Sequence, residues 1–214
     1  LDARTLDAIA GCPHRLVRTT RHPASRVVGD ATSCDDLYEA AARIDEVYPA
    51  IVERVVGAAR EHGEVLYAVP GAPNVAERTV ELLVADDRVE VEVLPALSFL
   101  DLTWARLAVD PLAACVRIVD GHRFAIDAAG ERGPLLVCQC DAPAVLSDIK
   151  LAVDDAPAEG VVVLQRLGLP DESITAVDWF DLDRDVDPDH LTSLWIPTLA
   201  EPVAQVLVDH PAVQ

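Results

Sequence analysis

Residues 66–83, "LYAVPGAPNVAERTVELL", contain the feature that most restricts how this chain can fold. An apolar run typical of a buried strand ends at a turn of two prolines and a glycine, and a helical pattern follows. Such strand–turn–helix units build α/β domains, in which ligands bind where the strands end. The sequence therefore predicts an α/β fold and a candidate ligand loop at residues 70–74.

The loop "PGAPN" has no charged side chain and lacks the GK[ST] and GxGxxG patterns of phosphate-binding loops. Its small residues suit a ligand bound through backbone amides and carbonyls, such as an adenosyl group. An ordinary turn remains the alternative for this loop taken alone. A second loop, "LSFLD" at 97–101, follows the next expected strand. Ser98 can simply cap a helix there, but two neighbouring strand-end loops favour a crevice.

Similar patterns extend along the rest of the chain and change character after "VDPLAA" at 109–114. We expect two α/β domains, 1–111 and 112–214, the first with a mostly parallel sheet and the second with a mixed one. Helices are expected at 1–11 with Leu6 and Ile9 inward, from about 34 to 62, after an Asn74 cap, at 99–108 and at 142–153. Strands are expected at 14–19, 64–69, 89–94, 115–119, 135–140, 160–168, 174–183 and 191–196. The final stretch, from residue 200, is expected to be loosely held.

Composition narrows the classes of function. A 51% share of hydrophobic residues over 214 residues is typical of a globular chain. The formal net charge of -20 disfavours nucleic acid and anionic membrane surfaces as partners, because both are negatively charged. No apolar stretch is long enough to span a bilayer, and no secretion signal is visible. Five cysteines without CxxC spacing indicate neither a disulfide framework nor a zinc site, which favours the cytoplasm.

Two further chemistries find little support in the sequence. The six histidines do not form HExxH, so no metal site is predicted, and no GxSxG hydrolase motif is present. Carboxylates cluster in "CDDLYEAAARIDEVY", as in magnesium-dependent pyrophosphohydrolases. The chain lacks the second ExxE or ExxD helix that would complete such a cage. A solvated helix face is therefore the favoured interpretation of these carboxylates.

The order and spacing of four segments carry a resemblance to a known family. "RTTRHPA", "CDDLYEAAARIDEVYPAIVERVV", "YAVPGAPNVAERTVELL" and "VEVLPALSFLDLTWARL" together resemble the tetrapyrrole methylases, closest to the YabN-like branch found as the N-terminal half of MazG-type proteins. The resemblance implies two α/β domains with S-adenosylmethionine in the cleft between them. It also implies a methyltransferase with a small-molecule substrate that the sequence does not identify.

The resemblance implies a set of cofactor contacts. Transfer of a methyl group needs positioning more than an acid–base pair, so the catalytic residues stay unknown. The two loops are expected to supply Pro70, Gly71, Ala72, Val75, Ala76, Ser98 and Phe99, and the loop that contains Ala72 is expected to be exposed at the cleft. The second half supplies Cys138, Gln139 and Leu167. The candidate substrate contacts, one from each of three resembling segments, are His22, Tyr38 and Asp101.

The chain departs from the family pattern in two places. The family begins with a strand that ends in a GxGPGD loop, whereas this sequence begins with the helix that would follow it, so the first strand is missing. Ala72 stands where the branch often has a polar residue and the wider family an aspartate. Both departures favour an alternative: a non-catalytic dimerisation or regulatory module associated with a MazG-type nucleoside triphosphate pyrophosphohydrolase. A homodimer is expected in either case, partly because the helix around 47–56 is strongly apolar.

Overall fold

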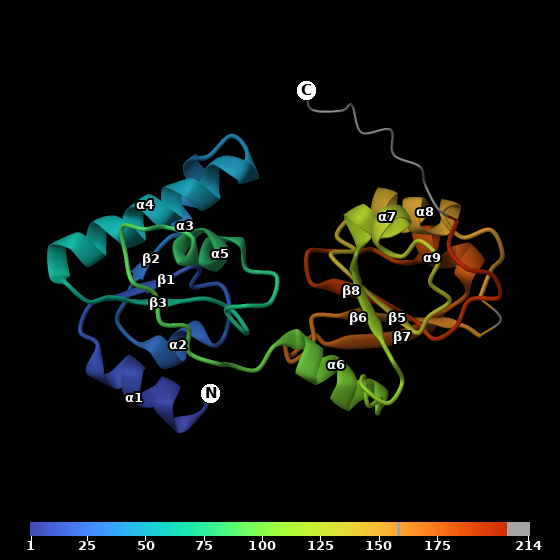
Figure 1. Ribbon diagram of the computed structural model, residues 1–214, viewed down its shortest axis with the longest axis horizontal. Coiled ribbons are helices and arrows are strands. Elements are labelled where there is room, and N and C mark those ends of the chain that lie inside the picture. Colours follow the sequence, from blue (N-terminus) through green and yellow to red (C-terminus); the bar gives the residue numbers. More distant parts are fainter. Residues whose placement is uncertain (158, 205–214) are drawn as a thin grey trace. The chain divides into compact units, whose positions relative to one another are not determined.

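The chain folds into two α/β units, Leu1–Asp101 and Leu102–Gln214, and the computed structural model describes residues 1–157 and 159–204 of them (Figure 1). Both the α/β class and the presence of one parallel and one mixed sheet are as the sequence predicts. The division between the units falls inside helix α6 (Phe99–Leu107), before residue 111. The domain ranges 1–111 and 112–214 therefore stay a prediction.

The first unit is built on a parallel sheet in the order β2-β1-β3. Its strands are β1 (Arg15–Val17), β2 (Thr32–Ser33) and β3 (Leu66–Ala68). Helices α1 (Ala3–Gly11) and α2 (Ser25–Val28) lie on one side of the sheet, and α3 (Asp35–Ala40), α4 (Ile44–His62) and α5 (Arg78–Val84) lie on the other (Figure 1). The three strands thus end at one edge, beside the loop that enters α5.

The apolar face of α4 forms the core of the first unit. Its buried residues Val47, Ile51 and Val55 pack with Leu16 of the sheet and Leu83 of α5. Their spacing follows the helical period, so this part of the prediction is confirmed. The same observation removes one argument for a dimer, because the face is covered within its own unit and is not left for a second copy.

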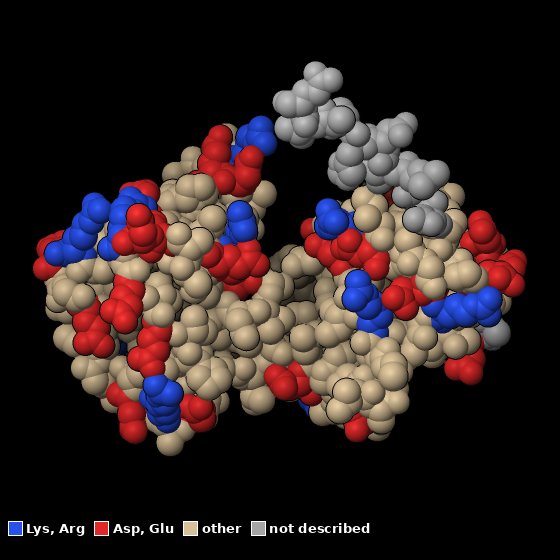
Figure 2. All heavy atoms as spheres, viewed as in Figure 1, with Lys and Arg blue, Asp and Glu red and all other residues tan. Residues whose placement is uncertain are grey.

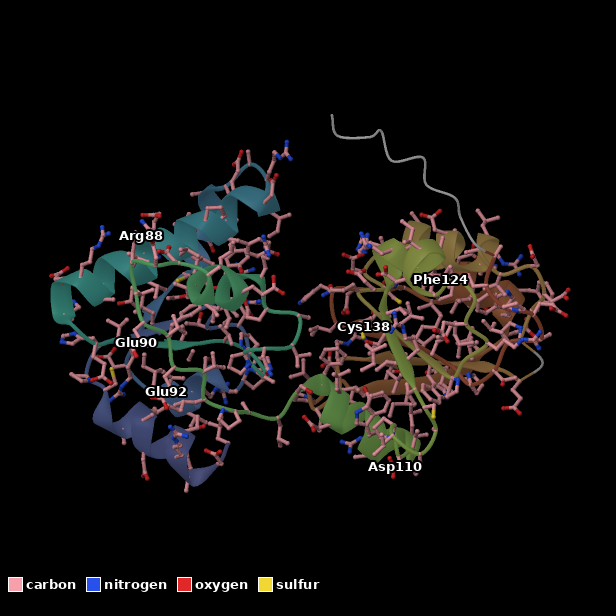
Figure 3. The ribbon with its side chains drawn as sticks, in the orientation of Figure 1. Arg88, Glu90, Glu92, Asp110, Phe124 and Cys138 are labelled. Carbon is pink, nitrogen blue, oxygen red and sulfur yellow. The ribbon has the colours of Figure 1, made fainter. Side chains whose placement is uncertain are left out.

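The segment between α5 and α6 corrects the sequence prediction. "VEVEVL" at 89–94 alternates like a strand but forms no sheet ladder. Val91 and Val93 are 38% and 41% exposed, and β3 is bonded only to β1. A pocket lined by both β3 and residues 88–94 separates the two segments. The alternating pattern fails because a strand needs a bonded neighbour within reach. Figure 3 shows Arg88, Glu90 and Glu92 along this segment.

The second unit contains a five-stranded sheet in the order β4-β5-β8-β6-β7. Its strands are β4 (Arg117–Asp120), β5 (Leu135–Cys138), β6 (Val161–Gln165), β7 (Ser173–Val177) and β8 (Thr192–Ile196). Only β4 and β5 are parallel; β8 is antiparallel to both of its neighbours. Helices α7 (Phe124–Asp127), α8 (Pro143–Leu151) and α9 (Leu182–Asp185) cover one face (Figure 1). Two 3-10 turns, Gly121–Arg123 and Trp179–Asp181, precede α7 and α9.

Smaller expectations fail for local reasons. Leu6 is 44% exposed, whereas Ile9 is buried as expected. The N-cap of α5 is Glu77 rather than Asn74, because a turn closed by Val75 donating to the carbonyl of Ala72 delays the helix. The stretch from residue 200 is expected to be loosely held, but Val203 is only 2% exposed and therefore packs against the rest of the unit. Residues 205–214 lie outside the described residues.

The surface and the aromatic residues are distributed unevenly. Acidic side chains are spread over the visible face of each unit, with basic ones among them (Figure 2). All three tyrosines lie in the first unit and all three tryptophans in the second, so each unit has its own optical reporter. Within the described ranges no helix combines the length and apolarity needed to cross a bilayer.

Candidate functional site

The loop after β3 has a backbone shape that its sequence explains. Gly71 has a φ of 73°, which glycine adopts without steric cost. Ala76 has a φ of 53°, a conformation that costs an alanine about 1 kcal/mol. Val75 donates its N–H to the carbonyl of Ala72 at 3.1 Å and closes a turn between them. The loop is therefore a preformed structure with Glu77 at its end.

The loop before α6 is fixed by reciprocal capping bonds. The Ser98 N–H and hydroxyl donate to the Asp101 carboxylate at 2.7 and 3.0 Å, and the Leu100 N–H donates to the Ser98 hydroxyl at 3.1 Å. These hydrogen bonds from the Ser98 backbone and side chain lower the pKa of Asp101. The capping role predicted for Ser98 is confirmed. Asp101 already has a structural task, which accounts for it without a substrate.

A pocket of about 740 Å³ lies between these two loops within the first unit. Its size is in the range of small-molecule sites. Among the predicted cofactor contacts it brings together Ala72, Val75 and Ser98, and Asp101 lies at its edge. The remaining lining residues are Pro73, Asn74, Val80, Glu81, Val84, Val93, Pro95 and Ala96.

The residues that line this pocket are suited to binding a ligand rather than to transferring protons. Glu81 and Asp101 are its only titratable lining residues, and Asp101 is engaged by Ser98. Ala72 is 6% exposed, which corrects the expectation of an exposed position: its own loop shields it. Apolar and backbone groups therefore dominate the wall. Among the described residues no group of three or more His, Cys, Asp or Glu side chains could hold a metal ion.

Other predicted first-unit residues lie elsewhere. Pro70, Gly71 and His22 line a larger pocket of about 1030 Å³, the one that separates β3 from residues 88–94. Burial lowers the pKa of His22, and the nearby charge of Arg18 lowers it further. Ala76 and Phe99 line neither pocket. The loop after β3 thus contributes residues to both pockets.

Sequence reasoning missed a buried polar network at the ends of β1 and β3. The guanidinium Nη1 of Arg18 donates to the carboxylate of Glu77 at 2.6 Å, and Glu77 is 3% exposed. The Thr79 hydroxyl donates to the same carboxylate at 2.7 Å and lies 3.0 Å from the Tyr67 hydroxyl. Burial opposes the charge of Arg18, but Glu77 more than offsets it and raises its pKa. The sequence held one indication of this network: Arg18 lies two positions after Leu16, so the two side chains point to the same face of the strand.

Tyr38, a candidate substrate contact, lies beside this network on α3. Burial raises the pKa of Tyr38, and Arg18 and Glu77 are close enough to influence it. Its hydroxyl oxygen is shielded from solvent and has no hydrogen-bond partner among the described residues. The three candidate substrate contacts therefore occupy three separate surroundings: His22 the larger pocket, Asp101 the smaller one, and Tyr38 the covered face of the sheet.

Two of the three second-unit candidates, Cys138 and Gln139, lie where β5 ends. Burial raises the pKa of the Cys138 thiol to about 12, which disfavours the reactive thiolate at neutral pH. Gln139 follows with a φ of 60° and an exposed side chain. Leu167 lies after β6 and is half-buried. Figure 3 shows Cys138 within the second unit.

Comparison with known proteins identifies the family. A family model described as "Tetrapyrrole (Corrin/Porphyrin) Methylases" matches residues 3–183. The chain belongs to the tetrapyrrole methylase family, as the sequence predicts. It is 35% identical over 194 residues to the uncharacterized protein YabN of Bacillus subtilis (strain 168), across 86% of this chain. The match spans only 39% of that relative.

Solved structures confirm the fold. Uroporphyrin-III C-methyltransferase from Thermus thermophilus superposes with a TM-score of 0.67 at 19% identity, over 92% of this chain and 87% of that one. A second structure of the Thermus enzyme, complexed with S-adenosyl homocysteine, gives a TM-score of 0.62 at 19% identity, over 91% and 89%. Precorrin-6Y methylase from Archaeoglobus fulgidus gives 0.64 at 23% identity, over 92% and 91%.

Proposed function

We propose that this chain binds S-adenosylmethionine and acts as a methyltransferase on a small-molecule acceptor. The observation that carries the proposal is the 740 Å³ pocket, whose wall combines small residues of the loop after β3 and of the loop before α6, in a member of a methylase family. A structure of similar fold, of a C-methyltransferase, is complexed with S-adenosyl homocysteine. The acceptor remains unspecified within the small-molecule class.

The residues present fit an adenosyl cofactor. Ala72, Val75 and Ser98 contribute uncharged surface to the pocket, beside the carboxylates of Glu81 and Asp101, and such surface suits a group recognised by shape and backbone contact. The preformed turn between Ala72 and Val75 lowers the ordering entropy that binding must overcome. The proposed contacts also include Pro70, Gly71, Ala76 and Phe99, and Cys138, Gln139 and Leu167 of the second unit, all supported by the family correspondence alone.

When bound, S-adenosylmethionine supplies an electrophilic methyl group. The task of this chain is then to orient that group and the acceptor and to exclude water. Of the two carboxylates in the pocket wall, Asp101 accepts hydrogen bonds from Ser98 and Glu81 pairs with Arg78 at 2.7 Å. Methyl transfer does not require a general base from the cofactor side. His22 remains the proposed contact for the acceptor, because it lines the adjoining large pocket with Pro70 and Gly71.

The test is a calorimetric titration with S-adenosylmethionine and S-adenosylhomocysteine. Asn74→Arg is the informative variant, because Asn74 is exposed yet lines the pocket, so an arginine is tolerated there and obstructs it. Affinity should fall at least about tenfold, roughly 1.4 kcal/mol. Ala72→Arg would fill the same pocket but disturbs a buried position, so it serves only as a second variant.

Ala85→Arg is the matched control. Ala85 is exposed at the end of α5 and lines neither pocket, so binding should be unchanged. Equal binding by the wild type and folded Asn74→Arg would place the cofactor elsewhere. If neither the chain nor a version extended upstream with a strand and GxGPGD loop binds either compound, the non-catalytic module partnered with a MazG-type pyrophosphohydrolase becomes the better proposal.

We further propose a cytoplasmic homodimer. The five cysteines carry no disulfide among the described residues, which is compatible with a reducing compartment. The dimer now rests on the family resemblance, since the apolar face of α4 is covered internally. Light scattering that gives a monomer mass at micromolar concentration would contradict the dimer.

A further inference from the structure

The first unit contains a slot between two segments that do not bond to each other. β3 is hydrogen-bonded to β1 alone, and residues 89–94 alternate like a strand without a ladder to any described strand. Both segments line the pocket of about 1030 Å³, and the part of that pocket between them is the slot. The slot therefore has a strand on one side and a strand-like segment on the other, as the place of an internal strand in a sheet does.

The backbone of β3 can accept a ladder on the side of the slot. Leu66 donates its N–H to the carbonyl of His14 at 2.9 Å, and the Ala68 carbonyl accepts from the Arg18 N–H at 2.8 Å, so both residues bond toward β1. The backbone groups of successive residues in a strand point to alternate sides. The N–H and carbonyl of Tyr67 therefore point toward the slot, where the described residues provide no strand partner.

The lining of the slot determines what kind of strand fits. Apolar side chains line it on both sides of the sheet: Ala8, Ile9, Cys12 and Val28 on the side of α1 and α2, and Val55, Ala59, Val80 and Leu83 on the side of α4 and α5. A strand that is buried on both faces is a continuous apolar run rather than an alternating one. The wall formed by residues 89–94 is about 20 Å long, which matches a strand of about six residues.

Helix α1 indicates where such a strand would join the chain. Near the start of α1, Arg4 pairs with Glu92 and the Thr5 hydroxyl donates to the carbonyl of Pro95 at 3.2 Å, so the helix begins against the far wall of the slot. It ends at Gly11, shortly before β1. A helix that leads to the start of a parallel strand is the crossover of a β–α–β unit. The position of α1 is that of such a crossover, with the slot at its upstream end.

We propose that the slot is a strand-insertion site. Its occupant is an apolar segment of about six residues joined to the start of α1, parallel to β3 and bonded both to β3 and to residues 89–94. Insertion turns 89–94 into a strand, which its alternating sequence already suits. Pro70 and Gly71 lie beyond β3, so a strand level with β3 does not cover them. The proposal does not depend on methyl transfer, because insertion is measured without any cofactor.

The test compares the chain with a version extended ahead of Leu1 by a valine- and isoleucine-rich segment of about six residues and a short glycine–serine linker. Tyrosine absorbance follows the melting of the first unit. The extension should raise its melting temperature by at least about 4 °C. A matched extension with proline at a central position lacks a ladder N–H and should give a clearly smaller rise.

Amide hydrogen exchange reports whether the added segment reaches β3. The Tyr67 amide should exchange at least about tenfold more slowly in the extended chain. Leu66 is the internal control, because its N–H is bonded to His14 with or without the extension. Slowing of the Leu66 amide measures general stabilisation, and the change at Tyr67 should exceed it.

Two variants test the other wall of the slot. Val91 lines the pocket and is 38% exposed, so Val91→Asp should change the unextended chain little. In the extended chain the same carboxylate would be buried against an apolar strand, and the rise in melting temperature should be lost. Val27→Asp is the matched control, since Val27 is 48% exposed and lines neither pocket, and it should keep the rise.

Three outcomes would overturn the proposal. Equal melting temperatures for the apolar and proline extensions, or a Tyr67 amide that slows no more than Leu66, would show that no ladder forms on β3. A rise that survives Val91→Asp would place the added segment elsewhere. A dimer mass in light scattering that the extension converts to a monomer mass would show that a second copy fills the slot instead.

Discussion

Removing the Glu77 side chain should selectively destabilise the first unit. Glu77 is 3% exposed, pairs with Arg18 at 2.6 Å and accepts a hydrogen bond from Thr79 at 2.7 Å. In Glu77→Ala the guanidinium loses its counter-ion while it stays largely buried, and the Thr79 hydroxyl loses its acceptor. Glu77 stands at the N-cap position of α5 without a side-chain capping hydrogen bond, so the loss is that of the buried ion pair and of the Thr79 acceptor.

The magnitude follows from the burial of the two charges. Removing one partner of a buried ion pair costs about 3–5 kcal/mol. Because 27% of the Arg18 side chain is exposed, water can partly solvate the orphaned charge, and the lower limit of about 3 kcal/mol applies. With a urea m-value of about 2 kcal/mol/M, the unfolding midpoint of the first unit should fall by about 1.5 M.

The partition of aromatic residues makes the two transitions separable. Tyrosine difference absorbance follows the first unit and tryptophan emission the second, because each residue type is confined to one unit. Only the tyrosine signal should move in Glu77→Ala. Glu61→Ala, at an exposed position on α4, is the matched control and should change neither midpoint. A midpoint shift below about 0.3 M, or an equal shift of both signals, would refute the reasoning.

Gly121→Ala should destabilise the second unit by about 1–3 kcal/mol, since a Cβ there would lie 3.0 Å from the carbonyl oxygen of Cys138. Gly160→Ala is the control and should change stability little, because the nearest atom to its Cβ would be 3.7 Å away. Unfolding in urea, followed by tryptophan emission, tests both variants. Cys115 is exposed, whereas the other four cysteines are buried, so one thiol should react quickly with a disulfide reagent and Cys115→Ser should abolish that phase. A chain extended upstream by a strand ending in GxGPGD should melt at a higher temperature, and equal melting temperatures would show that no such strand belongs to this fold.

The sequence predicted those helices and strands that pack against other elements of this chain. The period of α4 and the apolar runs of β5, β6 and β8 were decisive because each is buried against neighbours that the chain itself provides. The segment at 89–94 shows the limit of such patterns. Its alternation is a property of the segment alone, whereas strand formation depends on a bonded neighbour. β3 does not bond to this segment, and both line the same pocket.

The candidate site was predictable only where loop chemistry is local. The turn before α5 and the Ser98 cap follow from residues close in sequence, and the pocket between them was anticipated as a crevice. The Arg18–Glu77 pair joins residues 59 positions apart. No local pattern distinguishes that glutamate from the many solvated ones in so acidic a chain, so only the fold reveals it.

The place of β8 in its sheet determines when the second unit can form during synthesis. Residues 192–196 form the last strand within the described part of the chain, yet β8 lies between β5 and β6 and all five of its residues are buried. Until the ribosome has released them, β5 and β6 have no shared neighbour, and their buried apolar faces stay open. The three strands that the structure describes in the first unit are complete by Ala68, and this unit can fold far earlier. During synthesis the first unit can therefore be folded while the second unit cannot yet complete its sheet. The second unit is the part of the nascent chain for which a chaperone would be needed.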